Sequence, residues 1–146
     1  MTNRIDSVDE ILEFAIAREV EANQLYTYMA GRMKDPEMRK VCEELAKEEL
    51  EHKAKLELEV MKRGEVVRGI CISDYMTDAG DKIDMDYEEL LIFAIKKEDI
   101  SVNFYADLAA VVKDEESREA LLALAEEETE HKQRFEVEYD NLLKEN

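Results

Sequence analysis

The sequence predicts an all-α protein, a four-helix bundle made of a duplicated helical hairpin with a long crossover between the second and third helices. The chain of 146 residues holds one proline and four glycines, and its many Glu, Lys, Leu and Ala residues favour long helices over a sheet. Capping signals mark four helix starts, and the second half of the chain repeats the first. These observations together predict two similar hairpins packed as one bundle.

The first expected hairpin covers residues of about 7–64. Ser7-Val8-Asp9-Glu10 has the form of a capping box and starts a helix that runs to about Lys34. Asp35 is the expected cap of the second helix. Pro36 occupies its first position, where a missing N–H is tolerated, and Gly64 is a suitable stop.

The second expected hairpin covers residues of about 86–144. Asp86-Tyr87-Glu88-Glu89 repeats the capping box for the third helix. Asp114, followed by Glu115 and Glu116, opens the fourth helix with the charge sign that the helix dipole favours. We therefore expect a single domain over residues 1–146, with four helices of roughly 27 residues each.

The expected linker between the hairpins covers residues of about 65–85. A helix of 27 residues is roughly 40 Å long, and an extended segment of the linker's length reaches further than that. If the linker crosses the whole bundle, the second and third helices run parallel. A disordered loop is the alternative, although four apolar residues favour packing against the bundle: Val66, Val67, Ile70 and Ile72.

The repeat has a spacing of 79 residues. It aligns Glu19 with Glu98, Tyr26 with Tyr105, and Glu49-Leu50-Glu51-His52 with Glu128-Thr129-Glu130-His131. The two histidines of the chain close these two phrases. Because Glu-x-x-His places a carboxylate and an imidazole side by side on a helix, both side chains can bind one metal ion or one metal pair.

Each expected helix carries an apolar seam that an acid interrupts near its middle. Apolar residues recur at alternating spacings of three and four, which is typical of a bundle interior. Four buried carboxylates would each cost several kcal/mol unless cations compensate them. Two divalent cations balance four carboxylates, and oxygen-rich ligation with one imidazole per metal suits iron or manganese. The predicted metal ligands are Glu19, Glu49, His52, Glu98, Glu128 and His131.

Two tyrosines follow the same stripes as the acids. Tyr26 and Tyr105 lie two helical turns after Glu19 and Glu98. They are either core residues or, as the functional interpretation has it, donors of a hydrogen bond to a metal-bound carboxylate. We expect the remaining acids of the two phrases to form solvated helix faces: Glu48, Glu51, Glu127 and Glu130.

The composition excludes several classes of partner. With 20 Lys and Arg against 38 Asp and Glu, the net charge is −18, which repels nucleic acid and anionic lipid. The N-terminus lacks an apolar signal segment and no run is long enough to span a membrane, so we expect a cytoplasmic protein. Cys42 and Cys71 form no CxxC pair, which argues against a disulfide framework or a rubredoxin-type iron site.

The residues around the predicted ligands resemble those of a known family. Ala17-Arg18-Glu19 with Tyr26, then Glu48-Glu49-Leu50-Glu51-His52, and the repetition of both, resemble a rubrerythrin-like member of the ferritin-like superfamily. The resemblance implies a non-haem di-iron site that reacts with O₂ or H₂O₂. It further implies that Glu49 and Glu128 bridge the irons, and that each iron carries one terminal glutamate and one histidine.

The chain departs from that family in two respects. Rubrerythrins carry a rubredoxin domain with paired CxxC motifs, whereas this chain has no CxxC pair. The electrons are therefore expected to come from an external, rubredoxin-like donor. They also tend to carry a glutamate one turn after the third-helix ligand, where Ser101 stands, with Ala22 at the equivalent position of the first helix. This difference moves the expectation from a peroxidase toward ferroxidase-like chemistry.

Two alternatives stay open on the sequence alone. One is an oxygenase acting on an organic substrate, with small residues such as Ala15 and Ala22 lining a tunnel. The other is a non-catalytic iron-binding or storage subunit. The self-similar halves are compatible with a homodimer formed by exchange of hairpins.

Overall fold

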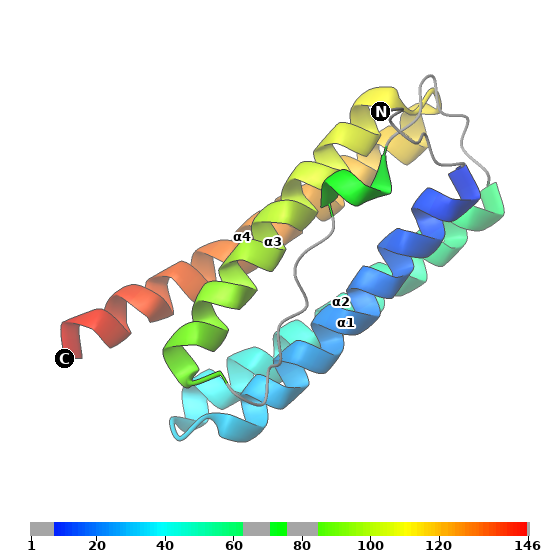
Figure 1. The fold of residues 1–146 in the computed structure, drawn as a ribbon. Helices are drawn as coiled ribbons and strands as arrows, with labels where there is room; N and C mark the ends of the chain where they lie inside the picture. The colour runs from blue at the N-terminus through cyan, green and yellow to red at the C-terminus, as the bar shows by residue number, and fades with distance from the viewer. Residues whose placement is uncertain (1–7, 63–70, 76–84, 146) are drawn as a thin grey trace.

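The computed structural model describes residues 8–62, 71–75 and 85–145 and consists of four long helices and one short one. The helices are α1 (Val8–Arg32), α2 (Pro36–Lys62), the 3₁₀ helix η1 (Ile72–Tyr75), α3 (Tyr87–Val111) and α4 (Glu115–Glu145). Among the described residues there is no strand, so the all-α prediction is confirmed. Figure 1 shows two antiparallel hairpins, α1 with α2 and α3 with α4, packed side by side.

Three of the four predicted caps lie among the described residues and are formed. Asp35 accepts a hydrogen bond from the backbone N–H of Glu37 at 3.1 Å. Asp86 accepts a hydrogen bond from the backbone N–H of Glu89 at 2.8 Å. The side chain of Glu89 in turn accepts one from the backbone N–H of Asp86, which completes the capping box. Asp114 accepts from the N–H of Ser117 at 3.0 Å. The predicted Ser7 cap lies outside the described residues.

Contacts between the hairpins fix the direction of the helices. At the end of α1, Arg32 donates to the carbonyl of Met85, just before α3 begins. Near the middle of α1, Arg18 donates to Lys97 and Ser101 of α3. α1 and α3 are therefore antiparallel, and α2 and α3 run parallel, as Figure 1 shows. The end of α2 and the start of α3 lie at opposite ends of the bundle, which agrees with the predicted long crossover.

The crossover is described at residues 71–75. Ile72 and Tyr75 of η1 pack against the core, as predicted for the apolar part of this linker. Val66, Val67 and Ile70 lie outside the described residues. The single-domain boundary of 1–146 remains a prediction, because residues 1–7, 63–70, 76–84 and 146 are not described.

Two apolar clusters fill the bundle, one toward each end. The first joins the start of α1 and the end of α2 to the end of α3 and the start of α4, with Leu12, Leu56, Phe104 and Leu124 among its members. The second joins the opposite ends of α1, α2 and α3 to the middle of α4, with Tyr26, Leu45, Leu91 and Phe135 among its members. Burying a large apolar side chain contributes about 1.5–3 kcal/mol. The two clusters therefore hold the hairpins together on both sides of the layer between them.

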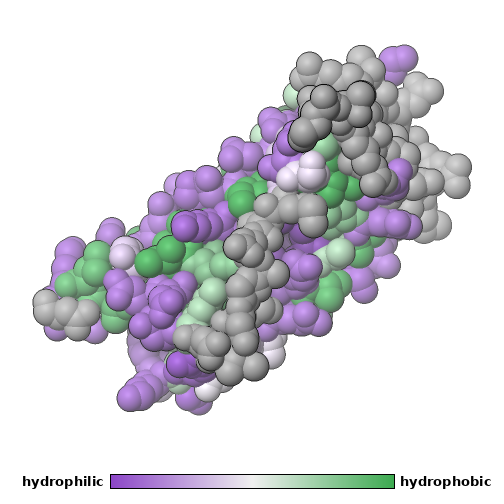
Figure 2. Space-filling view, in the orientation of Figure 1, coloured by the Kyte–Doolittle hydropathy of each residue, from purple (hydrophilic) through white to green (hydrophobic). Residues whose placement is uncertain are grey.

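The outer surface is mostly polar. Figure 2 shows a predominantly hydrophilic face over the helices, with hydrophobic residues in scattered patches. Four large apolar side chains are exposed among the described residues: Leu50, Leu122, Val137 and Leu143. Among those residues no helix is both long and apolar enough to span a membrane. In Figure 1 the last turns of α4 continue past the rest of the bundle, and there Tyr139 and Leu142 are half-buried.

Candidate metal centre

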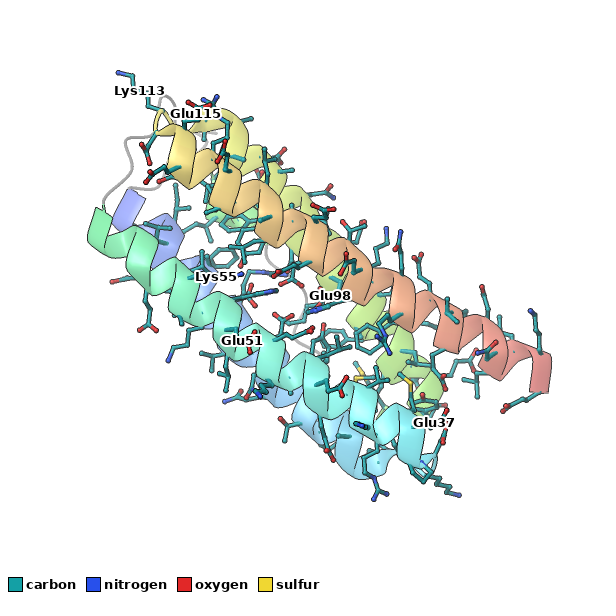
Figure 3. The ribbon with its side chains drawn as sticks, turned by 180° about the vertical axis from the view of Figure 1, so that it is seen from behind. Glu37, Glu51, Lys55, Glu98, Lys113 and Glu115 are labelled. Carbon is teal, nitrogen blue, oxygen red and sulfur yellow. The ribbon has the colours of Figure 1, made fainter. Side chains whose placement is uncertain are left out.

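A polar layer separates the two apolar clusters, and it contains all six side chains that the sequence predicted as ligands. None of them is more than 3% exposed. Figure 3 shows Glu98 inside the bundle, whereas Glu51, one residue before His52, lies on the outer side of α2. The structure thus brings together residues from four helices and from positions as far apart as 19 and 131.

The helix periodicity explains how each residue reaches this layer. Positions i and i+3 lie on the same helix face, so Glu49 and His52 point inward together from α2, and Glu128 and His131 do so from α4. Glu19 and Glu98 complete the layer from α1 and α3. This set, one glutamate from each of two helices and Glu-x-x-His from each of the other two, is the ligand set of di-metal carboxylate bundles.

The six residues form two overlapping groups of potential metal ligands. One group consists of Glu19, Glu49, His52 and Glu128, and the other of Glu49, Glu98, Glu128 and His131. Within each group, one ligand atom per residue lies within 4.8 Å of the others. Glu49 and Glu128 belong to both groups, so they lie between the two positions.

Both imidazoles turn their Nδ1 atoms toward the carboxylates. His52 Nδ1 lies 2.9 Å from an oxygen of Glu128 and 3.6 Å from one of Glu19. His131 Nδ1 lies 2.8 Å from an oxygen of Glu49 and 3.8 Å from one of Glu98. The two rings are stacked, with centroids 5.7 Å apart. Each Nδ1 atom is therefore aimed into one of the two groups.

Several buried polar atoms of the layer lack a hydrogen-bond partner. One oxygen of each of the four glutamates is in this state, as is the Nδ1 atom of His131. Although His131 Nδ1 is close to Glu49, the pair does not have hydrogen-bond geometry. Leaving a buried polar atom unpaired costs about 1–3 kcal/mol, and more if it is charged. Oxygen atoms and one imidazole nitrogen per position are the donor set that iron or manganese accepts, so the residues fit a pair of such ions.

The crowding of acids shifts their protonation. Burial raises the pKa of Glu49 and of Glu98 well above its ordinary value, and the neighbouring charge of Glu128 raises both further. Burial also disfavours the charged form of Glu128, but hydrogen bonds from Glu98, His131 and His52 outweigh it and lower its pKa. Without a metal, protons thus relieve the repulsion among the carboxylates.

The histidines are shifted toward the charged form. Burial alone would lower the pKa of His52, yet hydrogen bonds to Glu128 and Glu19 raise it to about 10. The pKa of His131 is also raised, chiefly by Glu128 and Glu48, against the effect of burial. Without a metal, the positive charge favoured on the two rings offsets part of the negative charge of the carboxylates.

Glu48 and Glu127 are partly exposed, as expected for solvated helix faces, but each also contacts a histidine of the layer. The Nε2 atom of His131 lies 2.7 Å from Glu48, and the Nε2 atom of His52 contacts Glu127. These side chains are 49% and 41% exposed, so they link the buried rings to the surface. The signal that could have found them is the repeat, since each precedes a layer glutamate and the two are 79 positions apart. Glu51 and Glu130 are exposed, as expected.

The two tyrosines donate to layer glutamates of the opposite hairpin. Tyr26 of α1 donates to Glu98 of α3, and Tyr105 of α3 donates to Glu19 of α1. Both phenols are fully buried, and burial together with Glu19 raises the pKa of Tyr105, which keeps that phenol protonated. Since each carboxylate receives a fixed donor, its orientation toward the centre of the layer is restrained.

Cys42 has no part in this layer. It is fully buried in the second apolar cluster, where burial and nearby glutamates raise the pKa of its thiol to about 12. Such a thiol is unreactive near neutral pH. Cys71 is partly exposed and lies beside Ser73 in the crossover.

Comparison with solved structures identifies the same architecture. A hypothetical protein from Pyrococcus furiosus is 28% identical, with a TM-score of 0.75 over 94% of this chain and 91% of its own. KatB, a manganese catalase from Anabaena PCC7120, has a TM-score of 0.70 at 16% identity, over 97% of this chain and 77% of its own, which speaks for the fold alone. The fold is thus the ferritin-like four-helix bundle.

Sequence comparison gives the family. No curated protein is significantly similar in sequence to this chain. The family model described as Rubrerythrin matches residues 10–139, a range that includes the whole polar layer. The chain therefore belongs to the Rubrerythrin family.

Proposed function

We propose that the chain holds two iron ions in the polar layer and acts as a non-haem di-iron oxidoreductase that reduces H₂O₂ or O₂. The observation that carries this proposal is the pair of overlapping four-residue groups, with one unpaired buried oxygen on each glutamate. Membership of the Rubrerythrin family supports it. Manganese is the alternative metal, because the same donors accept it.

In this proposal Glu19 and His52 would hold one iron and Glu98 and His131 the other, while Glu49 and Glu128, which belong to both groups, would contribute to both positions. Four carboxylates contribute −4, two neutral imidazoles contribute nothing, and two divalent ions contribute +4. The ligand layer then has no net charge. Removing the repulsion among the acids is what makes such a layer tolerable in the interior.

The remaining side chains act by positioning these ligands. When bound, the metal pair supplies the electrons for the oxidant and polarises it as a Lewis acid. Tyr26 donates a hydrogen bond to Glu98 and Tyr105 donates one to Glu19, and these bonds restrain both carboxylates. Glu48 accepts a hydrogen bond from Nε2–H of His131, which directs Nδ1 of that ring toward the metal position. The apolar clusters on either side exclude water from the layer.

We further propose that an external, rubredoxin-like donor returns the metal pair to its reduced state. Among the contacts described above, two join a buried histidine of the layer to a partly exposed carboxylate. They are Glu48 with His131 and Glu127 with His52. Electrons from the donor would enter the layer at these two pairs.

The decisive experiment is anaerobic loading of the metal-free protein with Fe(II), followed by metal analysis and separate exposure to H₂O₂ and to O₂. We expect about two irons per chain and an absorbance of oxo-bridged ferric iron after oxidation. Faster oxidation by peroxide than by oxygen supports the peroxidase branch. Consumption of an added organic compound together with O₂ would instead support the oxygenase. Binding of fewer than about two irons would refute the di-iron proposal.

A pair of variants distinguishes metal binding in the polar layer from diffuse binding to the acidic surface. Glu128→Gln and Glu126→Gln remove the same charge from one turn of α4, but Glu128 is buried in the layer and Glu126 is exposed. We expect Glu128→Gln to lose at least one iron per chain and Glu126→Gln to retain both. Equal loss in the two variants would indicate diffuse binding to the acidic surface. Uptake of many irons per chain by assemblies of the wild type would support storage.

A further inference from the structure

Arg18 is a buried cation beside the polar layer. It precedes Glu19 on α1 and is 5% exposed. Its guanidinium donates to the carbonyl of Lys97 at 3.1 Å and to the hydroxyl of Ser101 at 2.9 Å. Lys97 and Ser101 lie on either side of Glu98 along α3. A third hydrogen bond goes to the carbonyl of Tyr75 in the crossover.

All three partners of Arg18 are neutral. The guanidinium also lies 5.7 Å from the centroid of the Phe14 ring, and its Nε atom has no partner. Among the residues that the structure describes, no carboxylate forms an ion pair with Arg18. The hydrogen bonds to residues on both sides of Glu98 therefore place the positive charge of Arg18 beside the half of the layer that contains Glu98.

The repeat provides an internal comparison for this charge. The residue that corresponds to Arg18 in the second half is Lys97, which precedes Glu98 and is 4% exposed. Lys97 is paired, because its Nζ lies 3.0 Å from Glu21. The position that corresponds to Glu21 in the second half is Ile100, so Arg18 has no equivalent acid. Beside one half of the layer the cation thus pairs with an acid, whereas beside the other half the cation has no acidic partner in the part of the chain that the structure describes.

We propose that Arg18 makes the two metal positions unequal, so that the position of Glu98 and His131 binds a divalent cation more weakly than the position of Glu19 and His52. This inference rests on the proposed di-metal site. A like charge in a low-dielectric interior repels a divalent cation strongly over several ångströms. An effect of about tenfold on the dissociation constant is of the expected size. Loading at one equivalent of metal then fills the position of Glu19 and His52 first.

The test is a titration of the metal-free protein with Mn²⁺, followed by calorimetry and by electron paramagnetic resonance of bound Mn²⁺. Two separate binding events are not diagnostic in themselves, because two cations repel each other in any symmetric pair. The diagnostic quantity is the ratio of the two dissociation constants. Arg18→Met removes the charge and should reduce this ratio by about tenfold, while Arg18→Lys retains the charge and should leave most of it.

Lys97→Met is the matched control. It removes a cation at the repeat-related position but leaves Glu21 unpaired, so the added negative charge should tighten the position of Glu19 and His52 and increase the ratio. Opposite changes in the two methionine variants support the inference. An unchanged ratio in Arg18→Met, with two Mn²⁺ still bound, overturns it.

Ligand variants identify the weak position without altering Arg18. His131→Ala should retain the tighter binding event and His52→Ala the weaker one. The reverse assignment would also overturn the inference, even if Arg18→Met does not fold. Failure of the wild type to bind two Mn²⁺ per chain would instead count against the proposed di-metal site itself.

Discussion

The Nε2 atom of His131, which is almost fully buried, lies 2.7 Å from a carboxylate oxygen of Glu48, a residue of the opposite hairpin that is half exposed to solvent. The same contact recurs between His52 and Glu127. A carboxylate on the outer nitrogen of a ligating histidine fixes its tautomer, so that the inner nitrogen is free to bind a metal. The exposed acids of α2 and α4 are therefore of two kinds, and only those that face the other hairpin contact the site.

Glu48→Gln should weaken metal binding at the position of His131 by roughly 10–100-fold, because a neutral amide holds the imidazole less firmly than a carboxylate does. The measurement is the dissociation constant of Mn²⁺ for each of the two binding events. Glu51→Gln is the control, since it removes the same charge from an exposed position on α2. Equal weakening in both variants would mean that Glu48 acts through surface charge alone.

The metal-free protein should become less stable as the pH rises. His52 has a folded pKa of about 10, above its ordinary value of 6.5, and the pKa values of His131, Glu49 and Glu98 are raised as well. A raised folded pKa contributes stability that is fully present below the unfolded pKa and is lost as the pH rises through the folded pKa. In the presence of a chelator, the melting temperature should therefore fall between pH 6.5 and pH 10.

Metal binding should release protons, since the ions replace protons on these same groups. Two imidazolium groups and two protonated carboxyls give an upper bound of about four protons per metal pair. Calorimetric titrations in buffers of different ionisation enthalpy measure this number. Metal affinity should accordingly rise with pH, the opposite of the trend in metal-free stability. A proton release near zero at neutral pH would show that the histidines are not charged in the free protein.

Tyr26→Phe should lower the free energy of unfolding of the metal-free protein by about 1–3 kcal/mol, the usual cost of leaving a buried hydrogen-bond acceptor, here Glu98, without its partner. Denaturant unfolding measures it. Tyr28→Phe is a suitable control, because Tyr28 accepts a hydrogen bond from Arg32 at the exposed end of α1. If Tyr28→Phe proved equally destabilising, the buried contact with Glu98 would not be the cause.

Gly31→Ala should stabilise the protein by about 0.5–1 kcal/mol, because alanine has a higher helix propensity than glycine. Gly31 lies in the last turn of α1, and an added Cβ would meet no atom within 4 Å. The corresponding residue of α3 is Ala110, which is also exposed. Ala110→Gly should therefore destabilise by a similar amount. Thermal unfolding of both variants checks the pair, and a loss of stability in Gly31→Ala would contradict it.

The helices and the layer residues were predictable because their signals are local. Capping at Asp35, Asp86 and Asp114 depends on residues two or three positions away, and each cap is formed. The inward direction of Glu49 and His52 follows from helical periodicity within one helix. The expectation of a homodimer stays a prediction, and so does the role of each glutamate as a metal ligand.

Contacts between side chains of different hairpins depend on how one hairpin is rotated against the other. Glu48 and Glu51 are equally acidic and three residues apart on one helix, yet only Glu48 faces His131. Tyr26 and Glu98 likewise come from different hairpins, and no local pattern determines that they meet. Such pairs can be identified only when the packed faces of the helices and their relative positions along the bundle axis are known.

The fold class, the four helices and the six side chains that interrupt the apolar seams follow from the sequence alone. The direction of the third helix relative to the second was conditional on the path of the linker, and the contacts of Arg32 and Arg18 in the structure establish it. The structure was also needed to find that Arg18 has no acidic partner among the described residues, whereas Lys97 pairs with Glu21. The physical reason is the distance along the chain over which each kind of interaction acts. Helical periodicity and capping act within a few residues of one chain segment, whereas the pairing of a buried charge depends on which groups a different helix brings within a few ångströms.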